Sequence, residues 1–317
     1  MKKTYLLILI LFSFSQCQMN EDSITFEDEI FAEEPSLLSK TEATDYRGGI
    51  YISSFKDEIL GDVSEENKML SWLEQNNISV LHINKLKQIL SDAELADKLQ
   101  IFMKRVSVDY PDISVSFEVG NATCLDLIKE FIDTYNVVPS GIVTEIEFWN
   151  SNSSYIEFTE TARAMDKLKK IYKIEFDREF YVGPIKNNEG IDKLKRITDY
   201  LIANAETIYL TNYSAYPFTL YNSESPYSLS YKLKILAQSA KTKNKQVNVV
   251  IVYNLDNTSS DPNIYEYFDV LGENKQFADA HLEFLNELNT FNLENREWIN
   301  MKGYEIFKYE EAILARP

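Results

Sequence analysis

The segment SGIVTEIEFWN (residues 140–150) decides the fold assignment, because it combines a strand pattern with two closely spaced acids. Apolar and acidic residues alternate from Val143 to Phe148, which is the two-residue period of a β-strand. In an extended chain Glu145 and Glu147 project to the same side. Charged carboxylates are costly in a core unless they are paired, so the pattern favours a strand that ends in an open cleft. A sheet edge at which both acids face Lys or Arg partners is the alternative.

Short apolar strands alternate with amphipathic helical segments on both sides of this segment. Strands that alternate with helices predict parallel βαβ units, and eight of them predict a closed (β/α)8 TIM barrel of the α/β class. An open doubly wound sheet is the alternative, but no Gly-rich phosphate loop follows the first strand. The expected strands are 48–53, 79–83, 113–119, 142–148, 178–182, 207–213, 247–254 and 303–309.

The active face of such a barrel lies at the C-terminal ends of its strands. Four side chains of interest fall at predicted strand ends there, namely Glu147, Tyr213, Asn254 and Tyr309. About 280 residues are enough to bury one large core, so we expect residues 46–317 to form a single barrel domain.

The first residues have the pattern of a secretory signal. Two lysines precede an apolar run from Tyr5 to Phe14, which is too short to span a bilayer permanently. Ser15 and Gln16 separate the run from Cys17, which resembles the acylated cysteine of Bacteroidetes lipoproteins, and the acids at 21 and 22 resemble the surface-export signal of that phylum. We expect residues 1–16 to be a signal peptide and Cys17 to carry the lipid, palmitate included. An ordinary signal peptide that ends near Cys17 is the alternative.

Residues 17–45 are acidic and aperiodic, which predicts a flexible tether between the lipid and the barrel. The resemblance therefore implies a lipid anchor in the outer membrane, with display on the cell surface. Retention on the periplasmic side is the alternative.

Composition excludes several classes of function. The formal net charge of −18 would repel nucleic acid and anionic lipid, so neither is an expected partner, and membrane attachment would depend on the acyl chains. Two histidines argue against a zinc cluster or a Ser-His-Asp triad, and two cysteines, one of them predicted to be acylated, leave no internal disulfide. We expect no cofactor and no metal.

The fourth predicted strand resembles the signature of family 18 glycoside hydrolases, the chitinases and endo-β-N-acetylglucosaminidases. That signature has an acid, a glycine and then acids at alternate positions that end in Glu. On this chain it keeps Gly141 and ends at Glu147, which then holds the position of the general acid. Glu145 replaces the Asp that positions the N-acetyl group of the substrate, while Ser140 and Val143 replace the two earlier acids.

These departures bear on the chemistry that the resemblance implies. Family 18 belongs to the exceptions to the two-carboxylate scheme, because the acetamido oxygen of the sugar attacks the anomeric carbon. Glu is one methylene longer than Asp, so Glu145 would move its carboxylate by about 1 Å, a shift that can cost ~10²-fold in rate. Loss of the acid at Val143 removes a charge that helps to raise neighbouring pKa values. Reduced or absent activity is therefore one expected outcome.

The resemblance implies an enzyme that cleaves glycans containing N-acetylglucosamine at the cell surface, with Glu147 as acid/base and Glu145 as the orienting group. The alternatives are a non-catalytic glycan-binding lipoprotein on a degenerate barrel, and a structural surface protein without a working site. Aromatic and amide side chains near strand ends would contact sugar in the first two cases, although core packing accounts for such residues equally well. The substrate-binding candidates are Trp149, Asn212, Tyr213, Phe307 and Tyr309.

Overall fold

The computed structural model describes residues 47–184, 191–217, 220, 225–258, 262–271 and 276–315. In this part of the chain eight parallel strands follow one another around a closed barrel. The strands are β1 (Arg47–Ile52), β2 (Ile78–Ile83), β3 (Ser114–Val119), β4 (Gly141–Thr144), β5 (Asp177–Val182), β6 (Thr207–Asn212), β7 (Val247–Asn254) and β8 (Ile299–Phe307).

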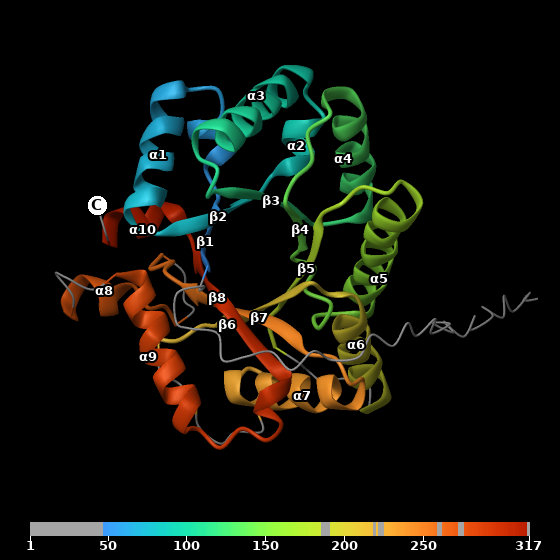
Figure 1. Ribbon diagram of the computed structural model, residues 1–317, viewed down its shortest axis with the longest axis vertical. Coiled ribbons are helices and arrows are strands. Elements are labelled where there is room, and N and C mark those ends of the chain that lie inside the picture. Colours follow the sequence, from blue (N-terminus) through green and yellow to red (C-terminus); the bar gives the residue numbers. More distant parts are fainter. Residues whose placement is uncertain are drawn as a thin grey trace, which may run out of the picture. The chain divides into compact units, whose positions relative to one another are not determined.

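Helices surround the ring of strands (Figure 1). They are α1 (Val63–Gln75), α2 (Leu86–Leu90), α3 (Ala93–Asp109), α4 (Ala122–Tyr135), α5 (Asn152–Asp166), α6 (Ile191–Asn204), α7 (Leu229–Thr242), α8 (Tyr265–Leu271), α9 (Phe277–Thr290) and α10 (Tyr309–Ala315). Short helical turns occur at Phe55–Ile59, Lys167–Ile171 and Arg296–Trp298.

The first and last strands close the barrel. Gly48 of β1 is opposite Tyr304 of β8, and Ile50 is opposite Ile306. Because every strand pairs with its sequence neighbour and β8 returns to β1, the predicted (β/α)8 barrel is confirmed and the open sheet is excluded. The segments predicted to be signal peptide and tether, Cys17 included, lie outside the described residues.

Two strands differ from the prediction by more than one residue at an end. β4 stops at Thr144, because the amide of Ile146 bonds to the Thr144 hydroxyl and the amide of Phe148 bonds to the Ile146 carbonyl, so the chain turns out of the sheet. The last strand begins earlier, at Ile299, and Tyr309 opens α10 instead of ending the strand.

Helix starts follow local capping. The carboxylates of Asp62 and Asp92 accept backbone amides at the first turns of α1 and α3. The Ser64 amide is one of the two that Asp62 accepts. These caps fix where each helix begins to cover the barrel.

Apolar residues form two layers. The larger one lies between strands and helices, and it includes Phe117, Phe180 and Phe284, each fully buried. A smaller cluster inside the barrel contains Tyr51, Val143, Tyr209, Val250 and Val252. The interior of the barrel is otherwise polar, and its polar groups form the site described next.

Candidate functional site

A buried histidine occupies the centre of the barrel. His82 on β2 is completely buried, and its two ring nitrogens lie 2.9 Å from Glu305 Oε1 on β8 and 3.3 Å from Glu179 Oε2 on β5. Glu179 also accepts the hydroxyls of Ser116 at 2.6 Å and Tyr209 at 3.0 Å. We call these five residues the interior ion cluster, which joins five strands across the inside of the barrel.

Two glycines make room for its carboxylates. A Cβ on Gly49 would lie 1.9 Å from Glu305 Oε2, and a Cβ on Gly141 would lie 2.6 Å from Glu179 Oε2. Contacts this short do not occur between real atoms, so any larger residue would have to displace a carboxylate. The interior ion cluster therefore requires glycine at positions 49 and 141.

The ion pairs fix the charge of His82. Burial alone would lower the pKa of His82, but Glu305 and Glu179 outweigh burial and raise it to about 10. Burial also acts to raise the pKa of Glu179, yet hydrogen bonds from His82, Ser116 and Tyr209 hold it below its usual value. The centre of the barrel therefore contains an imidazolium between two carboxylates at neutral pH.

A second pair of acids lies nearer the C-terminal end of the barrel. Glu118 is the penultimate residue of β3, and Glu145 directly follows β4. Both side chains are half-buried, and their carboxyl groups share a hydrogen bond. We call them the carboxyl pair.

The surroundings of the pair favour the protonated form of Glu145. Burial raises the pKa of Glu145 well above its ordinary value, and the charge of Glu118 raises it further. Burial also raises the pKa of Glu118, but the hydrogen bond from Glu145 lowers it in part. The charge of His82 lowers the pKa of both groups. The pair thus places two carboxyl groups with raised pKa values side by side, and the hydrogen bond between them favours a proton on Glu145.

Aromatic residues surround the carboxyl pair. Tyr51 stands between the two clusters, with its ring centroid 4.7 Å from that of His82, and burial followed by the charge of Glu145 raises its pKa well above the ordinary value. Phe307 packs against Tyr51 at 6.1 Å, and the Tyr181 hydroxyl lies 2.9 Å from the Tyr213 hydroxyl. Burial raises the pKa of Tyr181. These rings form an apolar rim with phenolic hydrogen-bonding groups.

The structure brings some of the predicted residues to this end of the barrel. Glu145 belongs to the carboxyl pair, Phe307 and Tyr213 belong to the aromatic rim, and Trp149 packs on Tyr181 with ring centroids 6.0 Å apart. Trp149 is also 8% exposed, so its ring contributes mainly through packing.

The remaining predicted residues lie elsewhere. Glu147 is exposed and bonds to the side chain of Asn150, so it does not join Glu145. The side-chain amide of Asn212 is buried and donates to the Pro217 carbonyl. Tyr309 is buried in α10. Its ring packs edge-on against Trp72 at 5.4 Å. The catalytic role of Glu147 and the sugar-binding roles of Asn212 and Tyr309 stay predictions.

Sequence reasoning missed Glu118 and His82. One signal could have found Glu118, since Ser114, Ser116 and Glu118 occupy alternate positions and mark a polar face of the third strand. His82 stands in an otherwise apolar strand, SVLHI, which gives no sign of its two partners on distant strands. Contacts between strands far apart in sequence are not written in any local pattern.

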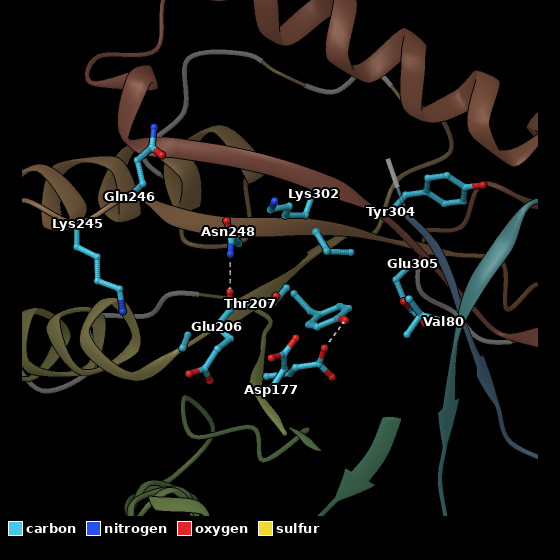
Figure 2. Close-up of a pocket in the computed structure, with 14 residues that line it drawn as sticks. Val80, Asp177, Glu206, Thr207, Lys245, Gln246, Asn248, Lys302, Tyr304 and Glu305 are labelled. Carbon is cyan, nitrogen blue, oxygen red and sulfur yellow. Dashed lines mark hydrogen bonds between the residues drawn. The ribbon is translucent and has the colours of Figure 1, made fainter. Parts of the chain in front are cut away.

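A pocket of about 490 Å³ opens at the other end of the barrel, where β5 to β7 begin. Figure 2 shows Lys245 and Gln246 at one end of this pocket and Val80 and Glu305 at the other. Glu179 also lines it. The interior ion cluster is therefore reached from the N-terminal end, away from the carboxyl pair.

The described residues provide no metal site or membrane span. Among them, no group of three or more His, Cys, Asp or Glu side chains is arranged to hold a metal ion. None of the helices in the described ranges is long and apolar enough to cross a bilayer.

Comparisons with known proteins found similar structures but no match to a family model or a curated protein. A β-glucosidase from Exiguobacterium marinum is similar in structure, with 9% identity, TM-score 0.49 and coverage of 84% of this chain and 90% of that one. A family 18 chitinase from Crocus vernus has 16% identity, TM-score 0.41 and coverage of 71% and 74%. A dihydrodipicolinate synthase from Bacillus clausii has 10% identity, TM-score 0.38 and coverage of 66% and 62%. At these scores the similarities carry no information on activity.

Proposed function

We propose that this chain is a glycoside hydrolase that acts at the C-terminal end of its barrel. The observation that carries the proposal is the carboxyl pair, in which burial and the neighbouring Glu118 raise the pKa of Glu145 well above its ordinary value. Cleavage of a glycosidic bond needs an acid that is still protonated at neutral pH, and a raised carboxyl pKa provides one. Both residues are half-buried, so part of each side chain faces solvent.

The spacing of the pair favours the substrate-assisted form of the reaction. In retaining enzymes that use a carboxylate nucleophile, the two carboxyl groups flank the sugar at about 5–5.5 Å. Groups that hydrogen-bond to each other are closer and lie on the same side of the sugar. We therefore assign Glu145 to protonate the leaving oxygen, while the acetamido oxygen of an N-acetylglucosamine residue attacks the anomeric carbon and Glu118 stabilises the positive ring that forms. Water then opens the ring, with the Glu145 carboxylate taking its proton.

This assignment differs from the one that the family 18 resemblance implies, in which Glu147 is the acid. The side chain of Glu147 is exposed and bonded to Asn150, whereas Glu145 is placed beside a second carboxyl group. The same substrate class follows from both assignments, and single substitutions separate them.

Three variants test the assignment. We expect Glu145→Gln to lower oligosaccharide release from an N-glycosylated protein by about 10²–10⁴-fold, because the acid is lost. Glu118→Gln should also lower it strongly, and Glu147→Gln should stay within a few fold of the unchanged chain. Loss of activity in Glu147→Gln with activity retained in Glu145→Gln would return the acid role to Glu147.

A non-catalytic glycan-binding protein is the second candidate. It is favoured by the partly exposed rings of Tyr181, Tyr213 and Phe307 near the carboxyl pair, since rings of this kind stack on sugars. Binding of glycan without release of sugar, unchanged in Glu145→Gln, would support this function in place of hydrolysis.

We further propose that the protein is anchored in the outer membrane through lipid on Cys17 and faces the cell exterior, which would place the barrel beside external glycans. The support is the sequence pattern of residues 1–22. Protease added to intact cells should remove the barrel domain, and Cys17→Ser should release the protein from the membrane fraction. Protection from protease in intact cells would indicate the periplasmic side instead.

A further inference from the structure

We propose that His82 is a positioning residue whose fixed positive charge, one layer beneath the carboxyl pair, keeps one member of that pair ionised. The catalytic consequence rests on the proposed function, but the electrostatic effect does not. His82 is completely buried, so it cannot contact a substrate directly.

The contacts of His82 hold its charge in place. Nδ1 lies 2.9 Å from Glu305 and Nε2 lies 3.3 Å from Glu179, so both ring nitrogens face carboxylate oxygens. A neutral imidazole has only one N–H and would present a lone pair to one of the carboxylates. Ser116 and Tyr209 hold Glu179 in turn. Loss of the proton would therefore leave one of the two carboxylates without a hydrogen bond from His82.

The strand register places this charge under the carboxyl pair. His82 is opposite Ser116 of β3, and Glu118 is two residues further along that strand, on the same inward face. Two residues of a strand span about 6–7 Å. At this separation, in a barrel interior that excludes most water, an opposite charge favours ionisation of a carboxyl group.

Other titratable groups face the same space from every side. Glu305 and Glu179 carry negative charges, and without His82 both would act on the pair unopposed. Burial raises the pKa of Tyr51 on β1 and of Tyr181 on β5, so both are uncharged at neutral pH. The Tyr209 hydroxyl on β6 donates to Glu179. The inward residues Val143 on β4 and Val252 on β7 carry no charge. His82 is thus the cation that the described strands place against the pair.

Titration of the pair in His82→Gln tests the inference directly. The readout is the carboxyl ¹³C signals of labelled glutamate against pH, assigned with Glu118→Gln and Glu145→Gln. We expect the ionisation midpoint of the pair to rise by about one pH unit or more in His82→Gln. His281→Gln is the matched control, because His281 is also buried but lies in α9, outside the barrel, and should leave the midpoint unchanged.

Glu305→Gln provides a test of opposite sign. It removes a negative charge from beneath the pair while Glu179 still holds His82, so the midpoint should fall. Disturbed packing alone would shift both variants in the same direction, and that result would overturn the inference. An unchanged midpoint in His82→Gln would overturn it too. If His82→Gln does not fold, the test is the midpoint of the pair in Glu305→Gln, and a midpoint that does not fall would overturn the inference.

Activity separates this inference from the proposed function. If the chain releases sugar, the acidic limb of its pH–rate profile should move to higher pH in His82→Gln, and not in His281→Gln. A shifted titration in a chain without hydrolytic activity would support the inference and refute the proposed function. Hydrolysis by the unchanged chain together with an unshifted titration in His82→Gln would support the proposed function and refute the inference.

Discussion

Lys232 shows how one buried side chain makes stability depend on pH. It lies in α7 and is 1% exposed, and its Nζ donates to the carbonyl oxygen of Thr211 at 2.6 Å and to the Thr211 hydroxyl at 2.8 Å. Burial lowers the pKa of Lys232 to about 7. In an unfolded chain the value is about 10.4. Between these two values the unfolded state binds a proton that the folded state has released, so the contribution of Lys232 to stability rises with pH.

Lys232→Met should remove this dependence. We expect the free energy of unfolding of the unchanged chain, minus that of Lys232→Met, to increase by up to about 1.4 kcal/mol per pH unit between about pH 7 and pH 10. Urea unfolding at several pH values measures it. Lys234→Met is the control, because Lys234 is an exposed residue of the same helix. A difference that stays constant with pH would contradict the assigned burial of the charge.

At the scale of single strands, the glycines of β1 and β4 decide whether the interior ion cluster can form. Gly49→Ala would push its Cβ into the Glu305 carboxylate, which cannot move without leaving His82. We expect a loss of about 1–3 kcal/mol of unfolding free energy, as for other overpacked interiors. Denaturant unfolding of Gly49→Ala and of the unchanged chain gives this value.

Gly120→Ala is the matched control for this change. Gly120 follows β3, and a Cβ built there would meet no atom within 4 Å. Its effect should stay within about 0.5 kcal/mol. Equal losses of unfolding free energy in Gly49→Ala and Gly120→Ala would contradict the steric conflict between a Cβ at position 49 and the Glu305 carboxylate.

Strand patterns predicted elements better than they predicted the site. β7 has the predicted bounds, because VNVVIVYN is apolar almost throughout. The fourth strand was predicted to continue to Phe148, since the alternation of apolar and acidic residues persists after Thr144 although the chain leaves the sheet. Alternation reports which side of the chain a residue faces, and not whether the backbone still pairs. That is why Glu145 was found from its sequence and its separation from Glu147 was not.

At the scale of the whole molecule, the closed barrel followed from the number and order of the strands, whereas its interior did not. Closure brings His82 of β2 against Glu305 of β8, residues 223 positions apart. Register then places Glu118 one pleat above Ser116, near the segment that carries Glu145. Each of these pairings depends on the tilt and stagger of eight strands together, which no single segment encodes. The sequence therefore predicts the closed barrel, but it does not predict which charged side chains meet inside it.

The pocket at the N-terminal end is a site where a reporter group can be attached close to the interior ion cluster. Lys302 is an exposed residue of that pocket, so Lys302→Cys would carry a fluorescent reporter close to the buried charges and away from the opposite mouth. Cys124 should compete little for the dye, because burial raises the pKa of its thiol to about 12. Adding Cys17→Ser to the same chain would leave a protein labelled at one position. The fluorescence of that probe, at the N-terminal end of the barrel, would then report binding at the C-terminal end.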